Sequence, residues 1–303
     1  MKSKYNIAII KAILAAVLYA ISTPASKVFL KEIPPMMMAS FLYLGAGVGM
    51  SLMGIIRHEN RRREKEPNLT KKERPYTIAM VALDIAAPIF LMFGLKMTTA
   101  ANASLLNNFE IVATALIALF IFKEKINKRL WFAIILITLS SIILSVKDAN
   151  SFSFSIGSVL VLLACVCWGL ENNCTRKIST KDPLQIVVIK GFGSGFGSLM
   201  LALAFGEQIR NVAYIPAVLI LGFFAYGLSI YFYVYAQREL GAAKTSAFYA
   251  IAPFVGVMLS FLILGERPDI QFAIALLIMI AGTYFASTDR KTTKSSQSGF
   301  RSV

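Results

Sequence analysis

Four ionisable side chains stand inside apolar stretches of about 20 residues each, a length that can cross a bilayer. They are Asp84, Glu110, Glu171 and Lys190. A charge within a bilayer costs about 2.5 to 3.5 kcal/mol on insertion scales, so each residue is a candidate for function. Carboxylates in that setting can carry protons or receive a cationic group. Their spacing predicts no metal site and no catalytic group.

Three of these residues lie at matching depth. At a rise of 1.5 Å per residue, Asp84, Glu171 and Lys190 come roughly 9 to 12 Å from the same end of their stretches. Glu171 and Lys190 are joined by a short connection, so we expect them to form an ion pair. That pair is either a permanent salt bridge or a gate that opens during a conformational cycle.

Glu110 belongs to a polar stripe on an otherwise apolar helix. The stripe has intervals of three, three and four residues, so its members share one helix face. They are Ser104, Asn107, Glu110 and Thr114. Such a face cannot lie against lipid, and it should line a cavity or a helix contact. We hypothesise that Glu110 couples to protons or binds a cationic substrate group. The alternative is a structural carboxylate held by Asn107 or Asn108.

Aromatic residues supply a further candidate site. Tyr226 lies deep in its apolar stretch, whereas the tyrosines and phenylalanine at 231–235 fit an ordinary interfacial aromatic belt. With Tyr19, Trp168 and Tyr249, Tyr226 is predicted to wall an amphipathic pocket for a small metabolite, where aromatic faces can also hold a cation.

Ten apolar stretches must position these residues. The chain of 303 residues is 57% hydrophobic and 16% charged, outside the usual range of soluble proteins. Backbone polar groups must be bonded internally in hydrocarbon, so we expect an all-α integral membrane protein. The predicted transmembrane helices are 7–29, 35–56, 76–96, 99–122, 130–147, 156–177, 184–205, 212–235, 241–264 and 270–288.

The basic residues predict the orientation of these helices. Lys and Arg number 31 against 16 Asp and Glu, a net charge of +15 that in a soluble protein would suggest a nucleic-acid partner. With both termini cytoplasmic, 24 of the 31 fall on the cytoplasmic side and Lys190 falls within a span. The excess of basic residues therefore reflects the orientation of the helices in the membrane, and we expect no nucleic-acid partner. The six outside are Lys27, Lys31, Lys96, Lys147, Arg210 and Arg267.

Enzyme chemistry finds little support. The single histidine, His58, lies in a charged run typical of a solvated loop. Cys165, Cys167 and Cys174 lack metal or redox spacing and are expected to pack helices. The chain has no GxxxxGK[ST] motif for nucleotide-driven transport. We expect no cofactor, no metal and no enzymatic activity.

The sequence also repeats internally. An offset of 149 residues aligns Lys27 with Arg176 and helix one with helix six, and an offset of 142 aligns Ala100-Ala101 with Ala242-Ala243 and helix four with helix nine. Each half holds five spans, and five is odd, so the halves must insert in opposite senses. This predicts two inverted five-helix repeats, an architecture that places a substrate site near the midplane.

These features resemble the drug/metabolite transporter superfamily, specifically the EamA-type permeases with ten helices. The resemblance covers about residues 8 to 288, and it is carried by Trp168-Gly169, by Ala100-Asn102-Ala103-Ser104 to Lys123-Glu124-Lys125, and by Gly241-Ala242-Ala243 through Pro253 to Leu264-Gly265-Glu266-Arg267. Glu124 and Glu266 close the family motif in helices four and nine. Their position at helix ends favours a structural role.

One departure from the pattern concerns helix four. Helix nine has Ala252-Pro253 where helix four has Glu110-Ile111, so we expect helix four to be unkinked and to bear a carboxylate at that point. Proline and glycine in helix nine, Pro253 and Gly256, predict either a fixed kink or a hinge.

The resemblance implies a secondary transporter in a prokaryotic plasma membrane. It would move amino acids or related small metabolites, in the export direction, with proton coupling as an option. The alternatives are a passive channel or a non-transporting scaffold, and less favourably a lipid enzyme. We expect a first repeat at 7–147 with a cytoplasmic loop at 57–75, a second at 156–288 and a disordered cytoplasmic tail at 289–303. The partners are a small-molecule substrate and the lipid bilayer. The glycines of 191–197 can pack helices within one protomer or between two copies in a homodimer.

Overall fold

The computed structural model describes residues 2–59, 69–121, 123, 126–148, 153–240, 245 and 248–287. Several expectations fall outside these residues. They are the carboxylate of Glu124, the motif Gly241-Ala242-Ala243, the loop residues 60–68 and the tail 289–303.

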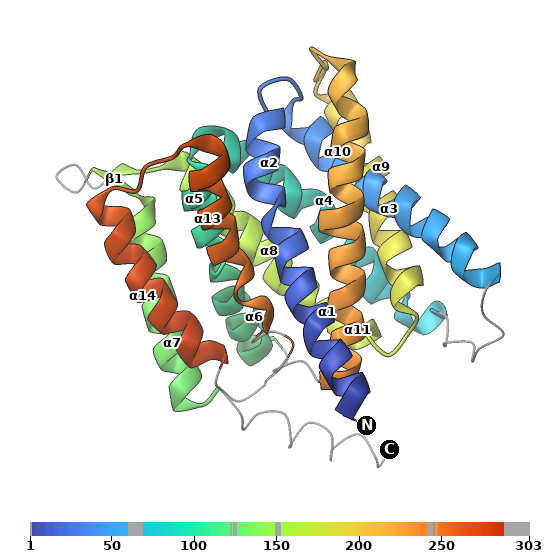
Figure 1. Ribbon diagram of the computed structural model, residues 1–303, viewed down its shortest axis with the longest axis horizontal. Helices are drawn as coiled ribbons and strands as arrows, with labels where there is room; N and C mark the ends of the chain where they lie inside the picture. Colours follow the sequence, from blue (N-terminus) through green and yellow to red (C-terminus); the bar gives the residue numbers. More distant parts are fainter. Residues whose placement is uncertain are drawn as a thin grey trace.

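The described chain is a bundle of helices (Figure 1). Nine of the described helical spans are long and apolar enough to cross a membrane, and the shorter apolar helix Ala252–Leu264 occupies the ninth predicted span. The prediction of an all-α membrane protein is confirmed. The helices are α1 (Lys2–Ala20), α2 (Ser22–Phe29), α3 (Pro35–Glu59), α4 (Arg74–Met97), α5 (Ala100–Leu106), α6 (Phe109–Phe120), α7 (Lys128–Ser145), α8 (Ile156–Ile178), α9 (Pro183–Ala204), α10 (Ile215–Gly222), α11 (Ser229–Leu240), α13 (Ala252–Leu264) and α14 (Ile270–Ser287).

Short elements complete the chain. Strands β1 (Val146–Asp148) and β2 (Ser153–Phe154) pair antiparallel between α7 and α8. The 3₁₀ turns η1 (Lys71–Glu73) and η2 (Val212–Tyr214) lead into α4 and α10. The π-helical turn η3 (Phe223–Leu228) joins α10 to α11 within the eighth span.

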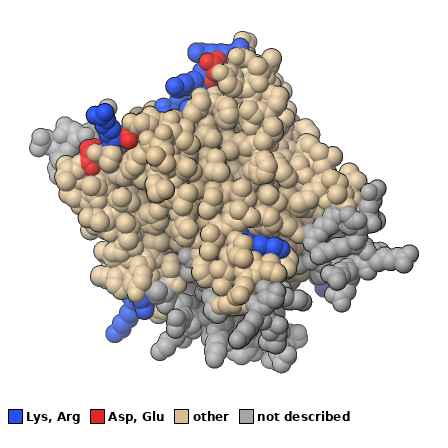
Figure 2. All heavy atoms as spheres, in the orientation of Figure 1, with Lys and Arg blue, Asp and Glu red and all other residues tan. Residues whose placement is uncertain are grey.

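The surface of the bundle suits a lipid environment. Large apolar side chains are widely exposed, for example Met200 on α9 at 71%, Leu262 on α13 at 73% and Ile270 on α14 at 79%. Figure 2 shows that most of one face carries no charged side chain, and that basic and acidic atoms lie mainly toward the two ends. Because exposed apolar surface of this extent is unfavourable in water, this band is the part of the protein that lies against hydrocarbon.

Helix packing has the same pattern in both halves. The second predicted span packs on the seventh (α3 on α9), the fourth on the ninth (α5 on α13) and the fifth on the tenth (α7 on α14). The third packs on the sixth (α4 on α8), as the eighth packs on the first (α11 on α1). Exchanging each span for its counterpart five spans away leaves the pattern unchanged, as for two halves related by a two-fold axis.

Helix four bears its carboxylate where expected, but its α-helical hydrogen bonding is interrupted just before Glu110. The helix breaks at Asn107 and Asn108, where α5 ends at Leu106 and α6 begins at Phe109. At this point the backbone bonds tighten to the 3₁₀ pattern, with the Asn108 N–H donating to the Leu105 carbonyl at 3.2 Å and the Glu110 N–H to the Asn107 carbonyl at 3.1 Å. Asparagine has a low helix propensity, which agrees with an interruption without proline. In the ninth span, α13 begins only at Ala252, next to Pro253. Breaks therefore occur at corresponding places in both halves.

The glycines of α9 pack against helices of the same chain. A Cβ on Gly191 would lie 2.3 Å from the backbone nitrogen of Gly47 on α3, and one on Gly195 would lie 2.7 Å from Leu44. On the other side, a Cβ on Gly193 would meet Val81 of α4 at 2.9 Å. Small residues here let α9 approach both α3 and α4 closely within one protomer.

Candidate functional site

Three helices bring a buried charge cluster together. Lys190 Nζ on α9 lies 2.8 Å from Glu171 Oε1 on α8 and 3.2 Å from Asp84 Oδ2 on α4. The side chains are almost fully buried, with residue exposures of 5% for Lys190, 3% for Glu171 and 1% for Asp84. The structure thus places all three in one layer and makes Lys190 the shared partner of two carboxylates.

Two hydroxyl groups complete the surroundings of the cluster. The Tyr43 hydroxyl on α3 donates to Asp84 Oδ1 at 2.9 Å, and the Thr175 hydroxyl on α8 donates to Glu171. Buried charges must be paired and hydrogen-bonded to offset their loss of hydration. With both carboxylates ionised the cluster has a charge of −1, because one ammonium faces two carboxylates. A single additional proton or cation would neutralise it.

The local sequence explains how the cluster forms. Gly191 follows Lys190 and lets α9 lie against the backbone of α3, which brings Lys190 into the interior. Pro88 lies inside α4, four residues after Asp84. It has no N–H to donate to the Asp84 carbonyl, so α4 lacks one helical hydrogen bond at the level of the cluster.

Glu110 has a partner that the sequence did not indicate. Asn172 Nδ2 on α8 donates to Glu110 Oε1 at 2.5 Å, so in the described chain the carboxylate is not held by Asn107 or Asn108, as the structural alternative had supposed. The next residue, Asn173, donates to the Thr114 carbonyl at 3.2 Å. The two asparagines thus join α8 to α6 over one helical turn.

The Trp168-Gly169 motif makes this helix contact possible. A Cβ on Gly169 would lie 2.7 Å from Ala113 Cβ and 2.8 Å from the backbone nitrogen of Thr114. Only glycine allows α8 to pack this closely on α6. Because Asn172 and Asn173 lie on the next turn, the same glycine sets their distance to Glu110 and Thr114.

The helix break next to Glu110 holds unpaired polar groups. Asn108 is 2% exposed, and among the described residues neither atom of its amide has a hydrogen-bond partner. The hydroxyl of Ser104, one turn earlier, also has none in the described chain. Asn107, 6% exposed, caps the C-terminus of α5 at the same break. Buried amides without partners are costly, which makes this break a candidate substrate-binding position.

The predicted pocket aromatics partly cluster. The Tyr19 ring lies 6.0 Å from that of Tyr226 in η3 and 5.9 Å from that of Tyr249. Tyr43, which the sequence analysis missed, packs on Tyr226 at 5.1 Å and also bonds Asp84. Trp168 is 7% exposed and belongs to the main apolar core. That these rings line a substrate pocket stays a prediction.

Two carboxylates cap helices between the halves. Glu266, after α13, accepts hydrogen bonds from the backbone N–H groups of Ala100 and Ala101 at 2.7 and 2.8 Å. Glu207, after α9, does the same for Met36 and Met37 of α3 at 3.2 and 2.9 Å. Helix N-termini carry unpaired donors and favour negative charge, so Glu266 has the structural role expected of it.

Comparisons with known proteins agree with this architecture. The model of the EamA-like transporter family matches residues 6–146 and again residues 155–288. The chain belongs to the EamA-like transporter family. An uncharacterized transporter of Methanothermobacter thermautotrophicus is 26% identical over 289 residues, covering 91% of this chain and 84% of that protein.

Further relatives of this EamA-like transporter have similar names. The uncharacterized transporter YyaM of Bacillus subtilis is 25% identical over 233 residues, covering 74% of this chain and 76% of its own. A solved crystal structure covers 95% of this chain with a TM-score of 0.67 at 16% identity, which shows a shared fold alone. The chain is therefore a multi-pass membrane protein of a transporter family.

Proposed function

We propose that this EamA-like transporter is a proton-coupled secondary carrier of small metabolites, such as amino acids or related compounds, working by alternating access in the efflux direction. The observation that carries the proposal is the buried cluster in which Lys190 contacts both Asp84 and Glu171. A network with one more acid than base is a costly feature for a scaffold, and it suits a group that gains and loses a proton in each cycle.

The charged residues have distinct proposed roles. Glu110 and Asp84 exchange protons, and the pair of Glu171 and Lys190 acts as the gate. Glu171 and Asn172 are adjacent on α8 and bond Lys190 and Glu110 respectively, so a movement of α8 acts on both sites together. A proton gained at one site and a change of partner at the other are thereby coupled through one rigid element.

The substrate is proposed to bind at the break between α5 and α6. The unpaired amide of Asn108 offers a donor and an acceptor, and Tyr19, Tyr226 and Tyr249 supply aromatic surface. Breaks in paired repeat helices near the midplane are typical of transporter substrate sites. We place the protein in the plasma membrane with both termini cytoplasmic, where the positive-inside pattern puts them.

Counterflow in proteoliposomes tests the transport function. Vesicles are loaded with an unlabelled mixture of amino acids, and the entry of the same mixture in radiolabelled form is followed at low external concentration. A carrier gives a transient, saturable accumulation of label. Equal accumulation with and without internal substrate, or a rate that rises linearly with concentration, would instead indicate a passive channel. No entry above protein-free vesicles contradicts transport of these compounds.

A further inference from the structure

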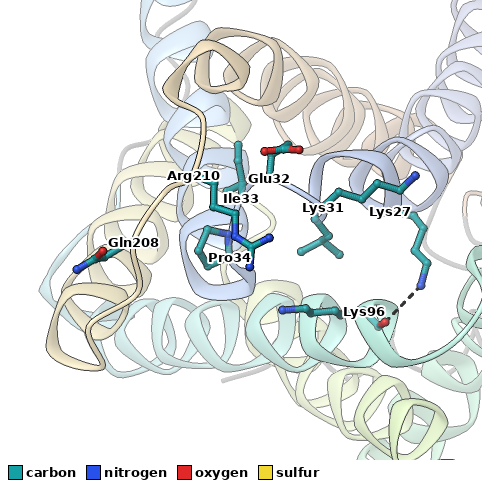
Figure 3. A pocket seen from close by; sticks show the side chains of 9 residues that line it. Lys27, Lys31, Glu32, Ile33, Pro34, Lys96, Gln208 and Arg210 are labelled. Carbon is teal, nitrogen blue, oxygen red and sulfur yellow. Dashed lines mark hydrogen bonds between the residues drawn. The ribbon is translucent and has the colours of Figure 1, made fainter.

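A second polar site lies at the end of the bundle far from the cluster. A cavity of about 420 Å³ opens where α2, the α2–α3 connection, the end of α4 and the α9–α10 connection meet. Its charged lining residues are Lys27, Lys31, Lys96 and Arg210 with one acid, Glu32 (Figure 3). Four basic side chains against one carboxylate give the lining a formal charge of +3.

The cavity walls are held in place by backbone contacts. The Arg210 N–H donates to the Glu32 carbonyl at 3.3 Å, which fixes the α9–α10 connection against the α2–α3 connection. Lys27 Nζ donates to the carbonyls of Leu95 and Thr98 at 2.5 Å each. These bonds hold the C-terminal end of α4 against α2. Figure 3 shows this ammonium turned toward the backbone beside Lys96. Lys27 is thus a structural cation of the wall.

In the described chain, the other three cationic side chains donate no such hydrogen bonds to backbone carbonyls. Within the described chain, Lys31, Lys96 and Arg210 have no carboxylate within 4 Å, and all three side chains are exposed. They come from segments far apart in the sequence and surround one opening. Unpaired like charges repel one another, so this arrangement is unfavourable until an anion is bound.

The position of these cations is also unusual. The positive-inside rule disfavours Lys and Arg on the outer side, where the proposed topology leaves six of 31. Four of those six, Lys27, Lys31, Lys96 and Arg210, line this single cavity. A scatter of tolerated charges would not be expected to gather around one opening. The concentration therefore favours a binding role.

We propose that this cavity is an outer anion-binding vestibule for small organic acids with carboxylate or phosphate groups. Lys31, Lys96 and Arg210 bind the anionic group, and Pro34, which is partly exposed in the lining, contacts the aliphatic part of the ligand. A volume of about 420 Å³ lies in the range of small-molecule sites. This binding site is separate from the proposed transport function. It can be tested separately, because binding is measured at equilibrium without any transport.

Binding of succinate and of inorganic phosphate tests the vestibule. Each is titrated at low ionic strength against the purified full-length protein in phosphatidylcholine nanodiscs, with ligand-observed NMR as the readout. An interaction of unit charges at 4 Å in water is worth about 1 kcal/mol, so Lys31→Gln and Arg210→Gln should each weaken binding about five-fold. Glu32→Gln removes the single lining carboxylate and should strengthen binding about five-fold. Added salt should weaken binding to the wild type.

Two controls separate a vestibule from general surface charge. Arg267→Gln makes the same charge change on the same side but outside the cavity, and it should leave affinity unchanged. Lys96→Arg keeps the charge and should keep the affinity. Absence of binding to the wild type, or equal effects of Arg267→Gln and Arg210→Gln, would overturn the proposal. All variants are checked for wild-type thermal stability, which exposed side chains should allow.

The same anionic chemistry is present in lipid headgroups. Repeating the titration in nanodiscs with added phosphatidylglycerol distinguishes the two sources. Unchanged succinate affinity indicates a site for soluble acids. Competition by phosphatidylglycerol that is lost in Arg210→Gln indicates the same cationic site occupied by a lipid phosphate. Competition that persists in Arg210→Gln to the same extent contradicts an anion site at the vestibule.

Discussion

The amide of Asn172 on α8 donates a 2.5 Å hydrogen bond to the carboxylate of Glu110 on α6. The residue before it, Glu171, contacts Lys190 at 2.8 Å. One helix therefore holds the two parts of the candidate site in a fixed relation. The consequences for stability and transport can be separated by substitution.

Removing the Lys190 ammonium should lower the stability of the protein far more than removing one of the two carboxylates. Lys190→Met leaves Asp84 and Glu171 facing each other without a counter-charge, and breaking a buried pair in this way costs about 3 to 5 kcal/mol. Asp84→Asn leaves a neutral one-to-one pair and should retain near wild-type stability. Thermal unfolding in detergent measures both. Equal losses in the two variants would show that the charge balance of the cluster is unimportant.

A charge swap tests the same geometry from the other side. Exchanging Glu171→Lys and Lys190→Glu restores the pair but places the new glutamate beside Asp84, which is 3.2 Å from Lys190 Nζ in the wild type. We therefore expect little rescue of stability by the swap alone and clear rescue when Asp84→Asn is added. Full rescue by the swap alone would contradict the shared role of Lys190.

Gly169→Ala should separate α8 from α6. Its Cβ would lie 2.7 Å from Ala113 Cβ, and overpacking of this kind costs about 1 to 3 kcal/mol. Gly206→Ala is a poor control. Its Cβ would have nothing within 4 Å, but the residue has a φ of +71°, at which alanine is strained. Ala113→Gly on the facing helix is the better one, since it should restore part of the loss in the double variant. The melting temperatures of Gly169→Ala, Ala113→Gly and the double variant test whether the two helices are in contact at this point.

Glu266→Ala should weaken the contact between the halves. It leaves the N–H groups of Ala100 and Ala101 without their acceptors, and losing a helix N-terminal acceptor costs about 0.5 to 2 kcal/mol. Arg267→Ala, at the neighbouring exposed position, should have no comparable effect on the melting temperature. A matching loss in Arg267→Ala would mean that this connection, and not the capping bonds, accounts for the change.

Much of the fold could be predicted from the sequence because the bilayer imposes a simple rule on backbone hydrogen bonds. Ten apolar runs gave the helices, and depth along them brought Asp84, Glu171 and Lys190 to one layer. The break at Asn107-Asn108 was missed because proline was taken as the marker of a kink. Two consecutive asparagines, which have low helix propensity, are a second signal of such an interruption.

The missed partners are contacts across the bundle. Asn172 and Tyr43 approach Glu110 and Asp84 only through helix packing at Gly169 and Gly191, which periodicity along one helix does not reveal. The cationic cavity was missed for the same reason. Lys31 and Arg210 are 179 positions apart in the sequence, and only the fold brings their connections together.

Proton coupling through Glu110 is the central claim, and one measurement tests it directly. Proteoliposomes containing wild type or Glu110→Gln are loaded with a labelled amino-acid mixture and given an inward proton gradient, and export of the label is compared with and without the gradient. We expect the gradient to drive concentrative transport in the wild type. In Glu110→Gln, which keeps shape but removes the charge, counterflow should persist while the response to the gradient is lost. An equal response in both proteins would contradict the account.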